Sequence, residues 1–172
     1  MKYSFSESGC SSCPFYSTAG SVLNETRYCG GFSKKRKPKR FNHRDPRYKA
    51  PKWCPKRLSV PICRVYCFAS EEARASMFLE LYTFGGIARS YIYPSSDRYR
   101  YRTEFPLKMT AKQFFDAANR HPIEELISET AIERGEIIEL DDGLQPYPFY
   151  YEGSGKLIPV YLLSPLKREV AP

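Results

Sequence analysis

The sequence predicts an α+β protein in two parts: a small, irregular four-cysteine module, then a compact domain with a mainly antiparallel sheet and two to three helices. Two observations lead to this prediction. Residues 10–58 combine four cysteines with five prolines and show no helical periodicity. From residue 60 onward, β-favouring runs alternate with capped helical patterns. We therefore place the boundary near residue 58 and expect domains over 1–58 and 59–172.

The composition is that of a folded chain. Of the 172 residues, 42% are hydrophobic and 15% are aromatic, which is enough for a real core. Fourteen prolines favour many loops and short elements over long helices.

The first part offers little regular structure. Residues 1–9 alternate Tyr3 and Phe5 with polar neighbours, which predicts a short strand or arm. Residues 10–58 are expected to be irregular. They cannot bury much apolar surface by themselves, so this segment needs an additional cross-link to hold its fold.

The second part opens with a strand, a helix and another strand. The first strand is predicted over residues 62–68, which read I-C-R-V-Y-C-F. Ser70 is expected to cap a helix over 70–82, with acids in its first turn and two glycines after it. A further strand is predicted over 88–93, and residues 97–102 are expected to be extended.

Two shorter helices and three strands complete the predicted domain. Thr110 and Gln113 form a capping-box pattern that opens a helix over 110–118. Pro122 suits the first position of a second helix, which Gly135 is expected to end. The last strands are predicted over 136–140, 148–152 and 157–163.

Four cysteines in the first part have the spacing of a metal site. Cys10 and Cys13 form a C-x2-C pair, which presents two thiolates to one ion. Cys29 and Cys54 are the obvious third and fourth ligands, because residues suited to tight turns adjoin each of them. Four thiolates around one ion are typical of structural zinc, so the pattern predicts a zinc site.

The same stretch resembles the cysteine module at the start of many small, mostly uncharacterised proteins of Firmicute bacteria and their phages. The shared residues are C-x2-C-P-F-Y from Cys10, Y-C-G around Cys29, and P-x-W-C-P around Cys54. The resemblance covers roughly residues 10–55 and implies a four-thiolate zinc site at Cys10, Cys13, Cys29 and Cys54. It implies no activity. The linker between the last two cysteines departs from the pattern because it is unusually basic.

Other uses of the cysteines stay open. Cys10 and Cys13 can form a reducible redox pair, or the four cysteines can be simple structural thiols. A thioredoxin-like motif needs a strand before it and a helix after it, and Pro14 with its loop-like flanks gives no such frame. Cys63 and Cys67 fall in a predicted strand, where we expect buried thiols that act as small hydrophobic groups.

Positive charge is concentrated in one segment. The formal net charge is +8, yet residues 34–57 hold twelve Lys or Arg against one acid, a balance of +11. Residues 58–172 hold thirteen basic and sixteen acidic residues, a balance of −3. This asymmetry indicates a nucleic acid, an acidic protein surface or an anionic membrane as the partner.

The basic segment lies between two predicted ligands, so we expect a tethered loop rather than a free tail. Its cations suit phosphates, and its aromatic rings suit stacking on exposed bases. A solvated charge run is the alternative, but +11 over 24 residues is self-repulsive without a neutralising partner. The candidate nucleic-acid-binding residues are Lys34, Lys35, Arg36, Lys37, Lys39, Arg40, Phe41, Arg44, Arg47, Tyr48 and Lys49.

A second candidate surface is the D-R-Y-R-Y-R stretch over 97–102. In an extended strand, Arg98, Arg100 and Arg102 share one face and the two tyrosines between them share the other. The arginine face suits phosphate groups. An edge strand protected by charge is the alternative interpretation.

These observations favour a non-enzymatic binding protein, in which a zinc-stapled module engages nucleic acid or a nucleoprotein complex through its basic loop. One alternative is a phage-encoded inhibitor or adaptor of a host nuclease system, of the anti-CRISPR kind, that contacts an acidic protein surface. A nuclease is the second alternative, although no ordered set of carboxylates supports it. No secretory signal or membrane span is visible, so we expect the cytoplasm of a bacterial host cell.

Overall fold

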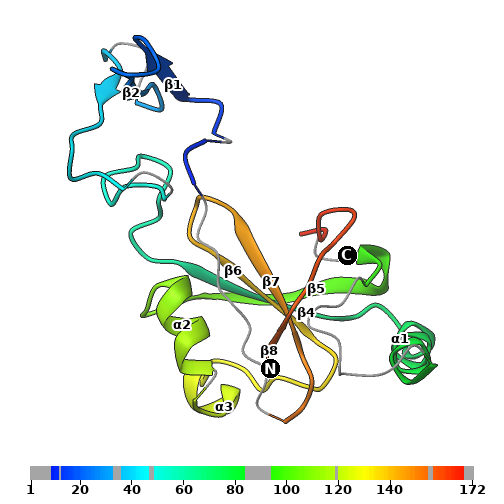
Figure 1. The fold of residues 1–172 in the computed structure, drawn as a ribbon. Helices are drawn as coiled ribbons and strands as arrows, with labels where there is room; N and C mark the ends of the chain where they lie inside the picture. The colour runs from blue at the N-terminus through cyan, green and yellow to red at the C-terminus, as the bar shows by residue number, and fades with distance from the viewer. Residues whose placement is uncertain are drawn as a thin grey trace. The chain divides into compact units, whose positions relative to one another are not determined.

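The structure is a computed structural model, and it describes residues 9–11, 13–32, 36–46, 49–83, 94–118, 120–154 and 157–168 (Figure 1). The chain divides into two compact units, one within Ser6–Leu58 and the other within Ser59–Pro172. The first unit contains a three-stranded sheet and the second a five-stranded sheet, and the strand pairs in both are antiparallel. With the helices of the second unit, this confirms the predicted α+β class.

The sheet of the first unit was not predicted. It has the order β1-β2-β3, with β1 at Tyr16–Ala19, β2 at Thr26–Cys29 and β3 at Lys39–Arg40. Strands of two to four residues are too short to leave a clear alternating pattern in the sequence. The β1–β2 turn needs glycine at Gly20, where φ is +108° and a Cβ atom would lie 2.4 Å from the carbonyl oxygen of Asn24.

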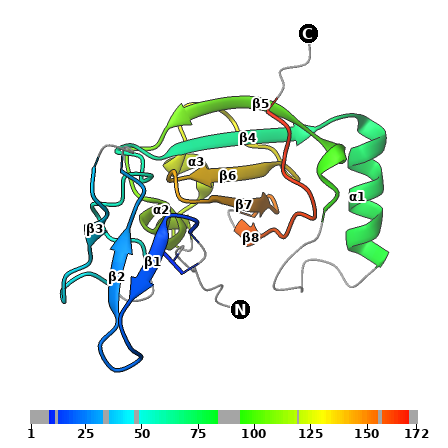
Figure 2. The same ribbon diagram turned by 90° about the horizontal axis from the view of Figure 1, so that it is seen from above.

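The sheet of the second unit has the order β5-β4-β6-β7-β8, so β4 is paired on both sides and β5 lies at an edge (Figure 2). These strands lie where the sequence predicts them, within a few residues at each end. Residues 1–8 of the arm predicted over 1–9, and the whole of the predicted strand over 88–93, lie outside the described residues. The strand bounds are Ile62–Phe68 for β4, Tyr99–Pro106 for β5, Ile137–Asp141 for β6, Pro146–Tyr151 for β7 and Leu157–Pro159 for β8.

Two helices form where their capping residues predict them. Helix α1 (Glu71–Thr83) follows Ser70, whose Oγ accepts the N–H of Ala73 at 3.2 Å. Helix α2 (Ala111–Ala118) follows a closed capping box. In that box the N–H of Gln113 donates to Oγ1 of Thr110 at 3.2 Å, and the N–H of Thr110 donates back to Oε1 at 2.9 Å. A 3-10 turn over Ser96–Arg98 precedes β5.

The helix predicted from Pro122 to Gly135 is wrong beyond its first turn. Helix α3 covers only Ile123–Leu126, and the chain is extended at Ile127, with φ −122° and ψ 103°. The following residues include Ser and β-branched Thr and Ile, which have low helix propensity. An irregular path buries both Ile127 and Ile132 in the core, with exposed fractions of 2% and 8%.

Both faces of the five-stranded sheet are largely covered. On one face, residues of α2 and α3 pack on β4, β6 and β7, with Phe114 and Ile123 fully buried (Figure 1). On the other face, Met77 of α1 and the chain after β8 pack on Tyr66, Ile137 and Tyr150. Cys63 belongs to the first face, where burial raises the pKa of its thiol to about 12. Cys63 is a core residue, as the sequence predicts, whereas Cys67 is only partly buried and the prediction is wrong there.

A buried charge row crosses the second face of this sheet. Arg64 on β4 is 4% exposed and donates to three carboxylates, those of Glu104 at 3.0 Å, Glu139 at 3.0 Å and Asp141 at 2.9 Å. Arg64 stands directly opposite Glu104 of β5 and Glu139 of β6 in the strand register. Burial alone would lower the pKa of Arg64, but the three hydrogen bonds outweigh burial and raise it. Arg64 is therefore a permanent cation inside the fold.

Candidate metal centre and nucleic-acid interface

The four cysteines of the first unit lie in short turns and at a strand end. The N–H of Cys13 donates to the carbonyl of Cys10 at 2.9 Å, which closes the C-x2-C turn. Cys29 is the last residue of β2. Cys54 lies in a second turn. Its N–H donates to the carbonyl of Pro51 at 3.0 Å, and its own carbonyl accepts the N–H of Arg57 at 3.1 Å. Three separate segments therefore present these thiols.

The three cysteine-bearing segments meet beside Gly31. A Cβ atom on Gly31 would lie 3.2 Å from Cγ of Pro55, 3.5 Å from Sγ of Cys29 and 3.5 Å from Cδ2 of Phe15. The N–H of Gly30 donates to the carbonyl of Phe15 at 2.8 Å. Phe15 follows the C-x2-C pair and Pro55 follows Cys54. Gly31 thus marks the point where the three segments meet, and an added side chain there would crowd only Pro55.

The thiols are close enough to influence one another. Burial raises the pKa of Cys10, and the charges of Cys54, Cys13 and Cys29 raise it further, while Arg27 opposes them. All four cysteines are free, and Cys29 is 8% exposed. Among the residues that the structure describes, no three His, Cys, Asp or Glu side chains are grouped tightly enough to hold an ion as they stand. The arrangement is thus a convergence of thiols rather than a finished coordination sphere.

The local chain does not fit a redox pair. A thioredoxin-like C-x2-C opens a helix, whereas Cys13 is followed by a turn and then by β1. The donor set is four thiols, which suits the preference of zinc for sulfur in structural sites.

Phe41 is a correction to the predicted interface. It is 6% exposed, and its ring packs edge-on against Tyr16 at 6.0 Å and against Trp53 at 5.0 Å between centroids. A buried ring cannot stack on a base, so Phe41 is part of the core of the first unit. Tyr48, another predicted stacking residue, lies outside the described residues.

Cations also pack on this aromatic core. Nζ of Lys39 lies 4.2 Å from the centre of the Trp53 ring, and the guanidinium of Arg27 lies 5.1 Å from that of Phe41. Arg27 further donates to the carbonyl of Pro46 at 3.1 Å. The sequence prediction did not single out Arg27, because it lies apart from the basic run; its place on β2 beside β3 could not be read from spacing alone.

Asp45, the one acid of the basic segment, forms hydrogen bonds within the first unit. Asp45 accepts the indole N–H of Trp53 at 2.8 Å through Oδ1, and the backbone N–H of Asn42 at 2.8 Å through Oδ2. It is only partly exposed, whereas the predicted cations that the structure describes around it are exposed. These exposed residues are Arg36, Lys37, Lys39, Arg40, Arg44 and Lys49. Three further predicted residues, Lys34, Lys35 and Arg47, lie outside the described residues.

The second predicted surface is largely engaged within its own unit. Arg98 pairs with Glu80 at 2.5 Å, and Arg102 pairs with the buried carboxylate of Glu136 at 2.6 Å. Arg100 is exposed, and its Nε donates to Sγ of Cys67 at 3.4 Å. Since β5 is an edge strand, these contacts favour the protected-edge interpretation of residues 98–102.

Comparisons with known proteins add no family to this description. No protein-family model, curated protein or solved structure matches the chain. Within the described part of the chain, no helix has the length and apolar character needed to cross a bilayer. Function is therefore inferred from the residues of the first unit.

Proposed function

We propose that the first unit is a zinc-stapled module that binds nucleic acid, free or within a nucleoprotein complex, through its basic segment. The supporting observation is the presentation of the cations. Exposed Lys and Arg side chains surround β3 and the following turn, while the segment's one acid, Asp45, accepts hydrogen bonds from Trp53 and Asn42. An exposed surface rich in Lys and Arg suits the phosphate backbone.

Zinc would be held by the four thiols of the converging segments. When bound, the ion would offset two of the four thiolate charges and cross-link Cys10 and Cys13 with Cys29 and Cys54. The segment from 30 to 53 then becomes a closed loop. Tethering both of its ends lowers the entropy cost of ordering the cations on a partner.

We expect the purified, reduced protein to contain about one zinc ion per chain, because four thiolates complete a tetrahedral site. Replacing Cys29 by Ser should abolish stoichiometric zinc. Zinc content is measured by mass spectrometry of metals. Trp53 is the single tryptophan and belongs to the first unit, so its emission should shift to the red when a chelator removes zinc.

Cys67→Ser is the matched control, since Cys67 is partly exposed and lies in the second unit. It should retain wild-type zinc. Zinc well below one equivalent in the reduced wild-type protein, or full zinc in Cys29→Ser, contradicts the zinc site but leaves the basic surface to be tested separately.

Nucleic-acid binding should fall steeply with salt. Affinity for a fluorescent 20-base-pair duplex and for a single-stranded RNA is measured by anisotropy between 50 and 300 mM salt. The logarithm of affinity against the logarithm of salt should have a slope of about −0.9 for each phosphate contacted on duplex DNA. The triple variant Arg36→Gln, Lys37→Gln and Arg44→Gln removes three exposed cations. Each contact that it loses should flatten the duplex slope by about 0.9.

A charge-matched control separates contact from net charge. Lys108→Gln, Arg120→Gln and Lys167→Gln remove three exposed cations from the second unit. We expect this variant to keep the wild-type slope. Equal slopes for all three proteins, or equal losses in both variants, would show that the basic segment makes no specific contribution, and the proposed function would then fail.

A further inference from the structure

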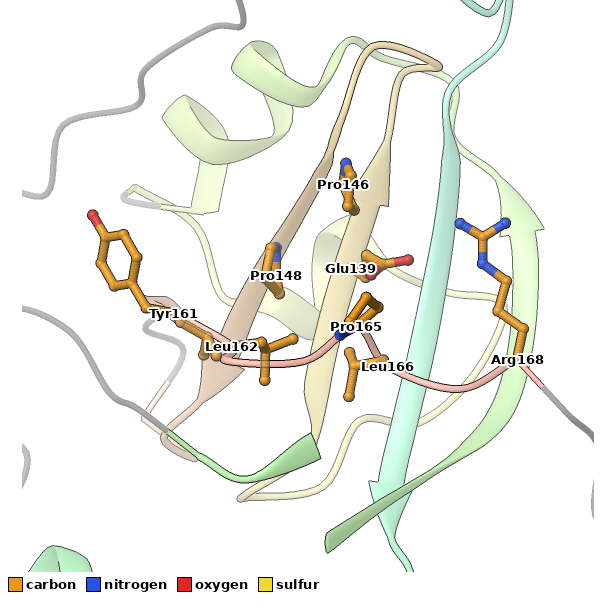
Figure 3. Close-up of a pocket in the computed structure, with 9 residues that line it drawn as sticks. Glu139, Pro146, Pro148, Tyr161, Leu162, Pro165, Leu166 and Arg168 are labelled. Carbon is orange, nitrogen blue, oxygen red and sulfur yellow. The ribbon is translucent and has the colours of Figure 1, made fainter. Parts of the chain in front are cut away.

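The second unit contains a cavity between the sheet and the chain that follows β8. Its volume is about 580 Å³, a size typical of small-ligand pockets. Figure 3 shows the segment with Leu162, Pro165 and Leu166 crossing the sheet beside Glu139. Apolar side chains form most of the wall, namely Pro146, Pro148, Val160, Leu162, Pro165 and Leu166.

Glu139 is the acid that lines this apolar cavity. It is 5% exposed, and its Oε1 accepts Nη1 of Arg64 at 3.0 Å and the hydroxyl of Tyr66 at 3.4 Å. Its second oxygen, Oε2, has no hydrogen-bond donor among the residues that the structure describes. A carboxylate accepts through both oxygens, so the cavity offers an unused acceptor.

The charge cluster that contains Glu139 has a negative balance, although only Glu139 and Arg168 of this cluster line the cavity. Glu104, Glu139 and Asp141 share the single guanidinium of Arg64, and Arg168 at the cavity rim lies 3.6 Å from Asp141. Three carboxylates against two guanidinium groups leave a formal charge of −1. A cation beside Oε2 would neutralise this charge, and an anion would be repelled.

We infer that this cavity binds an organic cation, a protonated amine or guanidinium group carried on an apolar stem. The cation donates to Oε2 of Glu139, and the stem packs on the proline and leucine wall. Such a group belongs equally to a small amine and to the Lys or Arg side chain of a partner protein. This inference concerns the second unit and does not depend on the proposed function of the first.

The test titrates butylguanidine into the isotope-labelled full chain and follows the methyl signals of Val160, Leu162 and Leu166 by NMR. We expect saturable shifts of these methyls, and none with pentanamide, a neutral compound of similar shape. Glu139→Gln should weaken binding at least tenfold, because it removes a charge-assisted hydrogen bond. A capped Leu-Arg-Leu peptide forms the second arm. Binding of the peptide at least tenfold more tightly than butylguanidine assigns the site to a partner's side chain; otherwise it is assigned to a small amine.

A second variant keeps the test decisive if Glu139→Gln unfolds. Arg168→Gln removes a like charge from the rim, where its side chain is 58% exposed, so the fold should be unaffected. Butylguanidine should then bind roughly threefold more tightly. Absence of saturable shifts in the wild-type protein, equal binding of pentanamide, unchanged affinity in a folded Glu139→Gln, or unchanged or weaker affinity in Arg168→Gln would each overturn the inference.

Discussion

Replacing Arg64 by Met should lower the free energy of unfolding of the second unit by about 3–5 kcal/mol at pH 7, the cost of breaking a buried ion pair from one side. Methionine fills much of the volume of the stem but leaves Glu104, Glu139 and Asp141 without their shared cation. Urea unfolding followed by far-ultraviolet circular dichroism measures the change. Arg168→Met is the matched control, since this exposed arginine should contribute under about 1 kcal/mol.

The loss should depend on pH. In the wild-type protein, burial alone would raise the pKa of Asp141, but the hydrogen bonds from Arg64 and the backbone N–H of Gly143, with the charges of Arg64 and Arg168, together outweigh burial and lower it. The stability that Asp141 contributes is therefore present above its unfolded pKa and is lost as the pH falls through the lowered folded value. Without Arg64, burial should dominate and favour the protonated carboxyl. The difference between the two proteins should shrink from pH 7 towards pH 4, and a constant difference would contradict the assigned role of Arg64.

Replacing Gly135 by Ala should destabilise the second unit by about 3 kcal/mol, through backbone strain and overpacking together. Gly135 has φ +98°, and a Cβ atom there would lie 2.5 Å from Cε2 and 2.8 Å from Cζ of Phe68. The Phe68 ring cannot withdraw easily, because it stacks on Tyr99 at 5.0 Å and contacts Phe78 at 5.9 Å. The same urea unfolding measures the effect.

Gly153→Ala separates the two causes of this loss. Gly153 also has a positive φ, +89°, but its Cβ atom would meet only the flexible side chain of Arg134, at 3.0 Å or more. We expect about 1–2 kcal/mol for backbone strain alone. Equal losses at both glycines would show that the Phe68 ring moves aside and that packing adds nothing at Gly135.

Local signals in the sequence located much of the second unit. Ser70 and the Thr110–Gln113 pair mark helix starts because each cap is completed within three residues. The apparent helix after Pro122 shows where such signals fail. Tertiary burial of Ile127 and Ile132 decided the path there, and that burial depends on strands distant in the sequence.

The features that depend on distant residues could not be predicted. Arg64 meets carboxylates 40 to 77 positions away, so nothing near β4 in the sequence marks it as buried. The cysteine spacing indicated which thiols to group, but not that Gly31 is the point where their segments meet. Phe41 was assigned to the interface because its neighbours in the chain are basic, whereas its neighbours in space are Tyr16 and Trp53.

The position of Arg64 also constrains how the strands can align during folding. In the observed register Arg64 faces Glu104 and Glu139, one on each adjoining strand. Side chains alternate between faces, so sliding a neighbouring strand by one residue would set an uncharged residue against the guanidinium and move its carboxylate to the helix-covered face. Two misplaced charges would penalise every such slip. The charge row therefore selects one alignment of β5, β4 and β6, which apolar packing alone would define less sharply.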